Sequence, residues 1–190
     1  VYNLPYFIRL TGDLDIAEFK TAVNQVVNCH EALRTTLAMI EDQPVQRIEQ
    51  SITVDIPVID IKEKAQNPGQ LDAYVSDLAA QPFDLTGGLL FRTAILKLSD
   101  MENGWFFMPH HIIFDGASFP IFLDQVLSCY QALAASKPEQ PIIPSLQFPD
   151  YAVWENKCRQ ENAFDQKLAY WTEKLTSPLP VLQLPTDFPR

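Results

Sequence analysis

Two adjacent histidines are the clearest candidates for proton-transfer chemistry in this sequence. His110 and His111 end an apolar stretch, and Asp115 and Gly116 follow at short spacing. An imidazole titrates near neutral pH, which suits a general acid or base. Because successive side chains of a strand point to opposite faces, we expect one ring to face inward and the other to open into a cleft. The alternative from the residues alone is a pair of packing histidines, with Asp115 capping the next helix.

Asp115 and Gly116 immediately precede a predicted helix. The N-terminus of a helix carries unpaired N–H groups and the positive end of the helix dipole, so it stabilises negative charge that develops nearby. Gly116 predicts a sharp turn at which a ligand can approach the backbone. These features favour a lone base that activates an incoming nucleophile against an acyl group that is already activated.

Two other chemistries fit the sequence poorly. Adjacent strand histidines diverge, the third histidine, His30, is distant in the sequence, and no cysteine or carboxylate cluster completes a metal site. A serine hydrolase of the Gly-x-Ser-x-Gly type is also disfavoured, because that motif is missing. We interpret Ser118 as a helix cap rather than a nucleophile. The sequence therefore predicts neither a metal ion nor a directly bound cofactor.

Composition excludes several kinds of partner. The 190 residues carry a formal net charge of −10 without a basic stripe, which argues against nucleic acid and against an anionic membrane surface. No apolar run approaches the ~20 residues of a membrane helix, and no signal peptide opens the chain. Because the sequence starts at a valine, we expect a fragment or a processed product. The three cysteines have neither metal nor redox spacing, so we expect buried, reduced thiols in a cytosolic protein.

Hydrophobic periodicity and turn residues predict alternating strands and helices. Strands are expected at residues 2–10, 33–40, 45–48, 89–98 and 104–108, with a further extended stretch at 52–61. Helices are expected at residues 15–29, 70–80, 118–135, 150–162 and 164–175. The Pro-rich residues 138–149 are expected to cross the surface in extended form. This order predicts an α/β sandwich with a mixed sheet rather than a doubly wound one.

The run from His110 to Gly116, His-His-x-x-x-Asp-Gly, resembles the active-site motif of condensation domains in nonribosomal peptide synthetases. Those domains belong to the chloramphenicol-acetyltransferase-like superfamily of CoA-dependent acyltransferases. Other stretches resemble further signatures of the family in the same order. They are HEALRTT at 30–36, PFDL at 82–85 with LLFR at 89–92, DYAVW at 150–154, and YW at 170–171 through LPTD at 184–187. The resemblance covers nearly the whole chain.

The resemblance implies a role for each residue of the motif. His111 would be the catalytic residue, placed in a tunnel between two lobes, where it deprotonates or orients an acceptor amine that attacks a donor thioester. His110 would be structural and would face away from the tunnel. Asp115 would pair with Arg34 and hold the histidine loop in shape. Gly116 would keep the tunnel open for a phosphopantetheine arm.

The resemblance also implies the architecture and the partners. We expect a chloramphenicol-acetyltransferase-like two-layer sandwich, with a mixed, largely antiparallel sheet and flanking helices, of which this chain is one lobe. Residues 1–176 would be the N-terminal lobe, and residues 177–190 would lead to the C-terminal lobe. Substrates would arrive on phosphopantetheine arms of peptidyl or acyl carrier protein domains, beside adjacent synthetase domains, in the cytoplasm. We expect the isolated chain to fold but not to catalyse.

Several related functions stay open on the sequence alone. An epimerization domain shares the histidine motif, although residues 30–35 resemble condensation domains more closely. A cyclization domain is disfavoured, because it carries aspartates where this chain has histidines. A free-standing acyltransferase that uses CoA thioesters and a non-catalytic lobe that only docks carrier proteins are the remaining alternatives.

Overall fold

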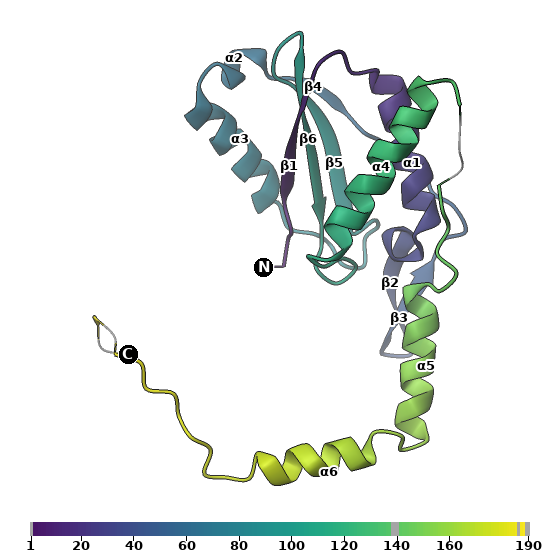
Figure 1. Cartoon of the computed structure of the whole chain (residues 1–190), viewed down its shortest axis with the longest axis vertical. Helices are drawn as coiled ribbons and strands as arrows, with labels where there is room; N and C mark the ends of the chain where they lie inside the picture. Colours follow the sequence, from purple (N-terminus) through teal and green to yellow (C-terminus); the bar gives the residue numbers. More distant parts are fainter. Residues whose placement is uncertain (1, 138–140, 186, 189–190) are drawn as a thin grey trace. The chain divides into compact units, whose positions relative to one another are not determined.

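The computed structural model describes residues 2–137, 141–185, 187 and 188 (Figure 1). The chain forms two compact units, Val1–Phe148 and Pro149–Arg190. Both histidines of the motif belong to the first unit. The division between the two units falls earlier than the lobe boundary predicted at residue 176 and does not test it. That boundary stays a prediction.

A four-stranded mixed sheet forms the centre of the first unit. Its strand order is β1 (Tyr6–Thr11), β6 (Glu102–Pro109), β5 (Phe91–Lys97) and β4 (Val58–Asp60). The first three strands run antiparallel to one another, whereas β4 is parallel to β5. The predicted mixed and largely antiparallel sheet is confirmed. Strand β6 is central, and all of its residues after Glu102 are buried.

A second, two-stranded sheet pairs β2 (Thr35–Ile40) with β3 (Gln43–Ile48) in antiparallel register. The turn between them places Glu41 and Asp42 at positive φ, 50° and 60°. A short 3₁₀ helix, η1 (Glu31–Arg34), leads into β2. The strand pair predicted for this region is therefore confirmed, with its first strand shortened by η1.

Helices cover both faces of the four-stranded sheet (Figure 1). Helices α1 (Ile16–Cys29) and α4 (Ser118–Ala134) pack on one face, and α2 (Lys62–Ala65) and α3 (Pro68–Ala80) lie on the other. The predicted α/β class is confirmed. Helix α3 adds a partial layer, because Leu71 packs there against Ala94 and Leu96.

Helix α1 begins where the sequence predicts. The Asp15 carboxylate accepts hydrogen bonds from the N–H groups of Ala17 and Glu18, both at 3.0 Å, and so satisfies two of the free donors at the helix start. Phe19 and Val23 recur at helical spacing and are fully buried. The cap fixes where the helix starts, and its apolar face holds it against the sheet.

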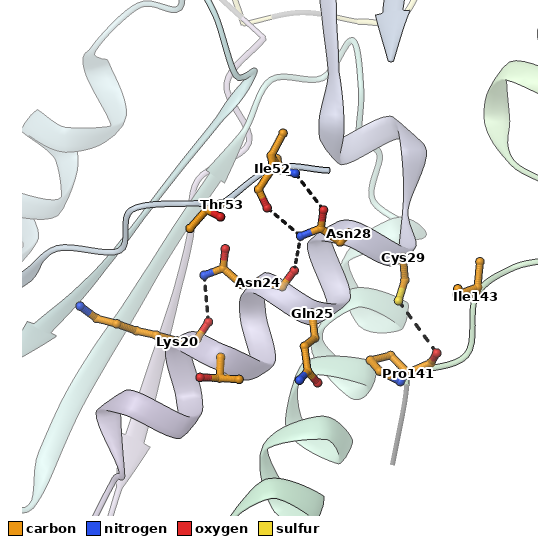
Figure 2. Close-up of a pocket in the computed structure, with 10 residues that line it drawn as sticks. Lys20, Asn24, Gln25, Asn28, Cys29, Ile52, Thr53, Pro141 and Ile143 are labelled. Carbon is orange, nitrogen blue, oxygen red and sulfur yellow. Dashed lines mark hydrogen bonds between the residues drawn. The ribbon is translucent and has the colours of Figure 1, made fainter. Parts of the chain in front are cut away.

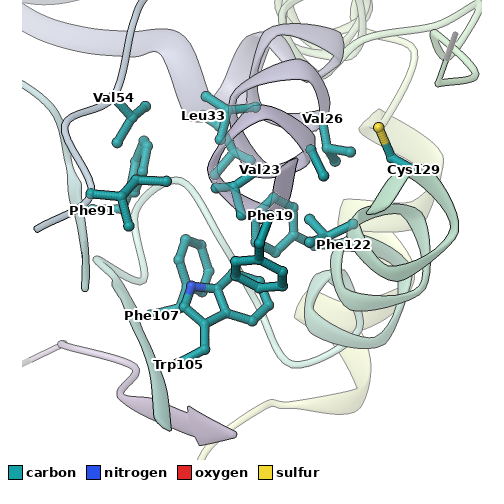
Figure 3. Packing of buried hydrophobic residues seen from close by; sticks show 14 of the residues in the cluster. Phe19, Val23, Val26, Leu33, Val54, Phe91, Trp105, Phe107, Phe122 and Cys129 are labelled. Atoms are coloured by element: carbon teal, nitrogen blue, oxygen red, sulfur yellow. The ribbon is translucent and has the colours of Figure 1, made fainter. Parts of the chain in front are cut away.

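The main core is aromatic and lies between the sheet and helices α1 and α4 (Figure 3). The rings of Phe19 and Trp105 meet edge to face at 5.1 Å, and Phe107 stacks on Phe122 at 4.6 Å. The Trp105 indole N–H donates to the Thr93 hydroxyl at 2.8 Å, and both residues are buried. This hydrogen bond joins β5 to β6 inside the core.

The extended stretch predicted at residues 52–61 forms a strand only at Val58–Asp60. Two asparagines of α1 pair with its first part instead, and Figure 2 shows the bonds between Asn28 and Ile52. The Asn28 amide exchanges hydrogen bonds with the N–H and C=O of Ile52, and the Asn24 amide does the same for Val54. Side-chain amides here replace a neighbouring strand, so extended backbone forms without a ladder.

The remaining differences from the predicted elements are small. Helix α2 was not predicted, and the last two helices are α5 (Phe148–Gln160) and α6 (Asp165–Lys174). The predicted extended crossing at 138–149 falls partly outside the described residues, and so does Thr186 of the LPTD signature. The last two residues of the predicted crossing, Phe148 and Pro149, belong to α5.

We predict that Thr93→Val destabilises the first unit by about 1–3 kcal/mol, because the buried Trp105 indole N–H loses its acceptor. Urea unfolding monitored by tryptophan fluorescence measures this loss. Thr93→Ser is the matched control, since it keeps the hydroxyl, and it should cost less. Equal losses in the two variants would contradict the importance of the hydrogen bond.

Candidate active site

The two histidines of the motif directly follow β6, and the backbone holds them on both sides. The His110 N–H donates to the carbonyl of Leu90 at 2.7 Å, and the His111 N–H donates to the carbonyl of Tyr2 at 2.7 Å. Leu90 precedes β5 and Tyr2 precedes β1, the two neighbours of β6 in the sheet. The pair is thus fixed to the sheet rather than to a free loop.

The ring of His110 lies on the side of the chain that packs. It meets the ring of Tyr2 at 6.4 Å and that of Phe83 at 5.9 Å, both edge to face. Its Nδ1 accepts a hydrogen bond from the Ile112 N–H at 3.1 Å, which requires a free lone pair on that nitrogen. Burial lowers the pKa of His110, and the neighbouring His111 acts in the same direction. His110 is therefore held as a neutral ring that shapes the turn.

An arginine supports the packing of His110. The Arg92 guanidinium lies over the Phe83 ring, 4.3 Å from its centroid, and donates to the carbonyls of Gln81 at 3.0 Å and Pro82 at 2.6 Å. Both Phe83 and Arg92 occur in family-like stretches of the sequence, but nothing in their spacing predicted this contact. Their place in the PFDL and LLFR stretches was the only available signal.

His111 lines a cavity of about 350 Å³, which we call the outer cavity. Residues 111–115 form one side of it. The other walls are Ala32, Thr35, Gln46, Ser118 and Phe148. His111 is exposed, and within the described part of the chain its ring forms no hydrogen bond. One ring therefore packs and the other is open to a cavity, as the alternation along a strand predicts.

Asp115 is bound by the helix that follows it. Its Oδ1 accepts from the Ser118 N–H at 2.8 Å and from the Ser118 hydroxyl at 2.6 Å. These bonds are the main reason why the pKa of Asp115 lies below its ordinary value, and the His111 ring contributes in the same direction. Our interpretation of Ser118 as the cap is wrong, because Ser118 is the first residue of α4 and its side chain binds Asp115.

The predicted ion pair between Asp115 and Arg34 is not formed. Arg34 pairs with Glu31 at 3.2 Å and donates to the carbonyl of Glu49. Glu31 lies one turn earlier in the same 3₁₀ helix, so it is already within reach when η1 forms. The carboxylate of Asp115 takes its hydrogen bonds from Ser118 instead. Among the described residues, the Arg34 Nε is buried without a hydrogen-bond partner.

Gly116 leaves space open but is not required by the backbone. A Cβ built at this position meets no heavy atom within 4 Å, and the φ angle of Gly116 lies outside the left-handed region. The expected sharp turn therefore does not need the conformational freedom of glycine. What Gly116 provides is an unfilled position beside the histidine loop.

A second cavity, of about 600 Å³, lies over the outer face of α1 (Figure 2). Its walls include Asn24, Asn28 and Cys29. Both asparagine amides are already hydrogen-bonded to the chain, so the cavity offers little free polar chemistry.

Of the three free cysteines, Cys29 and Cys129 are buried and Cys158 is only half-buried, so the expectation of three buried thiols is wrong for Cys158.

The described residues include neither a candidate metal site nor a helix suited to a membrane. No group of three or more histidine, cysteine or acidic side chains lies in an arrangement that could hold a metal ion. No helix in the described part of the chain combines the length and the apolar character that crossing a membrane requires.

Solved structures with the same fold define the class of this lobe. The X-domain from teicoplanin biosynthesis is similar with a TM-score of 0.86 and 26% identity, over 100% of this chain and 42% of that one. The starter condensation domain of rhizomide synthetase RzmA is similar with a TM-score of 0.83 and 25% identity, over 93% of this chain and 43% of that one. The fold is that of condensation-type domains.

The model of the condensation domain family matches residues 1–190, and the chain belongs to this family. A linear gramicidin synthase of Brevibacillus parabrevis is 38% identical over 100% of the chain. A surfactin synthase of Bacillus subtilis is 35% identical over 100% of the chain. The chain spans only 4% and 5% of these two relatives and less than half of the solved domains.

We predict that Ser118→Ala raises the pKa of Asp115 toward its ordinary value of 3.8, because the variant removes the hydroxyl that binds the carboxylate. A lowered pKa stabilises the fold at pH values above the ordinary value, and that stabilisation is lost as pH falls through the folded pKa. The acid-side loss of stability should therefore be smaller in the variant.

Carboxyl NMR titration measures the pKa of Asp115, and urea unfolding at several acidic pH values measures the stability. Ser128→Ala is the matched control, since Ser128 is an exposed serine of the same helix. An unchanged Asp115 titration in Ser118→Ala would contradict the assignment.

Proposed function

We propose that this chain is the N-terminal lobe of an amide-forming acyltransferase and that His111 is its catalytic residue. The observation that carries the proposal is the state of the His111 ring. The backbone N–H groups of His110 and His111 are bound to the chain ahead of β5 and β1, whereas the exposed His111 ring forms no hydrogen bond with the described residues and His111 lines a cavity. A side chain held in this way can meet a substrate at little cost in reorganisation.

The proposed reaction joins an acceptor amine to a donor thioester. The amine nitrogen attacks the thioester carbonyl, the new C–N bond forms, and the C–S bond breaks. His111 accepts or orients the proton that the amine loses, and the proton leaves with the thiol. Because the thioester is activated before it arrives, no covalent intermediate on the enzyme is required.

Asp115 supports this chemistry through charge rather than through contact with Arg34. Its lowered pKa keeps the carboxylate ionised, and its charge and that of His111 are close enough to interact. The Asp115 carboxylate thereby places a negative charge near the ring that accepts or orients the amine proton. In this proposal His110 and Arg34 are structural.

We further propose that both substrates arrive on phosphopantetheine arms of peptidyl or acyl carrier protein domains. Tethering raises the effective concentration of each substrate, so the lobe needs little affinity of its own. The C-terminal lobe of the domain would close the tunnel, and adjacent synthetase domains would supply the carriers. The three free thiols support a cytoplasmic setting.

We predict that His111→Ala lowers the transfer rate by about 10²–10⁴-fold in the intact domain, because the reaction loses its proton acceptor. Single-turnover transfer between two loaded carrier proteins measures this rate. Met101→Ala is the control, since Met101 is 60% exposed in the β5–β6 hairpin and lines neither cavity. Residues 1–190 alone should fold, as circular dichroism would show, and should not exceed the rate of the His111→Ala variant. Turnover above that rate would contradict the need for the second lobe.

We predict that Gly116→Ala leaves folding unchanged or stabilises it by about 0.4–1 kcal/mol, because the position is open and its φ suits alanine. The same variant should lower the transfer rate, because the methyl group occupies space that the phosphopantetheine arm needs. Thermal unfolding and the transfer assay separate the two effects. A variant that transfers at the wild-type rate would contradict this role of Gly116.

A further inference from the structure

A smaller cavity adjoins the outer cavity, and we call it the inner cavity. It has a volume of about 140 Å³. Ala32, Ile113, Phe114 and Ser118 line both cavities. The two cavities therefore lie side by side and share a boundary made of these four residues.

The far end of the inner cavity is made of apolar side chains. Leu33 and Phe122 belong to the main core and are each only 2% exposed. Ile121, which is 56% exposed, forms the outer edge. None of the described walls is an Asp, Glu, Lys or Arg residue. A charged group placed here would lose its hydration without gaining a partner.

The polar groups at the inner cavity are already hydrogen-bonded. The His30 Nε2 lies 2.5 Å from the Gln125 Oε1, and an amide oxygen only accepts, so the ring nitrogen donates to it. The hydroxyl of Ser118 donates to Asp115. A ligand group in this cavity would therefore be held by apolar contact rather than by hydrogen bonds to these side chains.

The volume of the inner cavity sets the size of the group that fits. A cavity of about 150 Å³ lined by leucine, isoleucine and phenylalanine stays dry and binds benzene. The inner cavity is similar in volume, and its lining is mostly apolar, with His30 and Ser118 as the polar residues. Branched aliphatic and phenyl groups fit such a space, whereas an indole is too large and a methyl group leaves most of it empty.

We propose that the inner cavity is a specificity pocket, and that it binds an apolar side chain of aliphatic or phenyl size on the aminoacyl substrate that reacts beside His111. The proposal rests on the proposed function, because that function brings an aminoacyl group to His111. The side chain can belong to the donor or to the acceptor, since the walls of the cavity recognise only its size and its apolar character.

Single-turnover transfer in the intact domain tests the proposal and distinguishes donor from acceptor. In one arm the donor carrier is loaded in turn with Ala, Leu, Phe, Trp and Lys while the acceptor is Gly, and in the other arm the roles are exchanged. We expect Leu and Phe to exceed Ala, Trp and Lys by about tenfold or more in one arm, the scale on which an apolar pocket discriminates.

Ile121 is the residue to vary, because it edges the cavity and is exposed enough to change without unfolding the core. Ile121→Ala should lower the preference for Leu over Trp by about tenfold, and Ile121→Trp should lower the preference for Leu over Ala. Met101→Ala is the control, since Met101 is 60% exposed at the far end of the β5–β6 hairpin. If the wild type and the three variants show the same preferences among the loaded amino acids in both arms, the proposal is overturned.

A binding measurement separates failure of the pocket from failure of the proposed function. Residues 1–190 are titrated with toluene and followed by methyl NMR. We expect saturable shifts at Ile113 and Ile121, no shift at Met101, and loss of the Ile113 shift in Ile121→Trp. If no variant transfers any substrate but toluene binds, the proposed reaction is wrong and the pocket stands. If toluene does not shift these methyl groups, the pocket is overturned whatever the transfer assay shows.

Discussion

Two backbone hydrogen bonds at the end of β6 determine the geometry of the site. They run from His110 to the carbonyl of Leu90 and from His111 to the carbonyl of Tyr2, each at 2.7 Å. One bond reaches the chain ahead of β5 and the other the chain ahead of β1, so the backbone is held on both sides of the strand end. Because successive side chains of extended backbone point to opposite faces, the two rings point apart. One ring consequently packs, half-buried, against Tyr2 and Phe83, and the other residue lies beside the cavity.

The rest of the first unit keeps that strand end in place. Strand β6 is central in the sheet, and its Trp105 and Phe107 side chains form the middle of the aromatic core. Phe122 of α4 packs on Phe107, so the same core that holds β6 also positions the start of α4. Asp115 lies between these two elements and is bound to α4 through Ser118. Core packing and site geometry are thus parts of one structure.

The sequence predicted elements well where local patterns determine them, and less well where contacts distant in sequence do. The Asp15 cap and the apolar period located α1, and alternation indicated that one histidine ring would pack and the other would be open, without showing which. Residues 52–61 were predicted to be extended, but nothing local shows that asparagine amides of α1 would pair with residues 52–54 in place of a neighbouring strand. Likewise, the partner of Arg34 was misassigned because Glu31 competes for the same guanidinium.

The position of Asp115 also limits where the negative charge of the reaction can be stabilised. A helix N-terminus can stabilise an oxyanion only if its N–H groups are free. Here the Asp115 carboxylate accepts the Ser118 N–H at the start of α4, so this N–H group stabilises a charge of the protein instead of one of the substrate. In the proposed reaction, α4 therefore acts indirectly. It holds an ionised carboxylate near His111, and the tetrahedral oxyanion needs donors other than the Ser118 N–H.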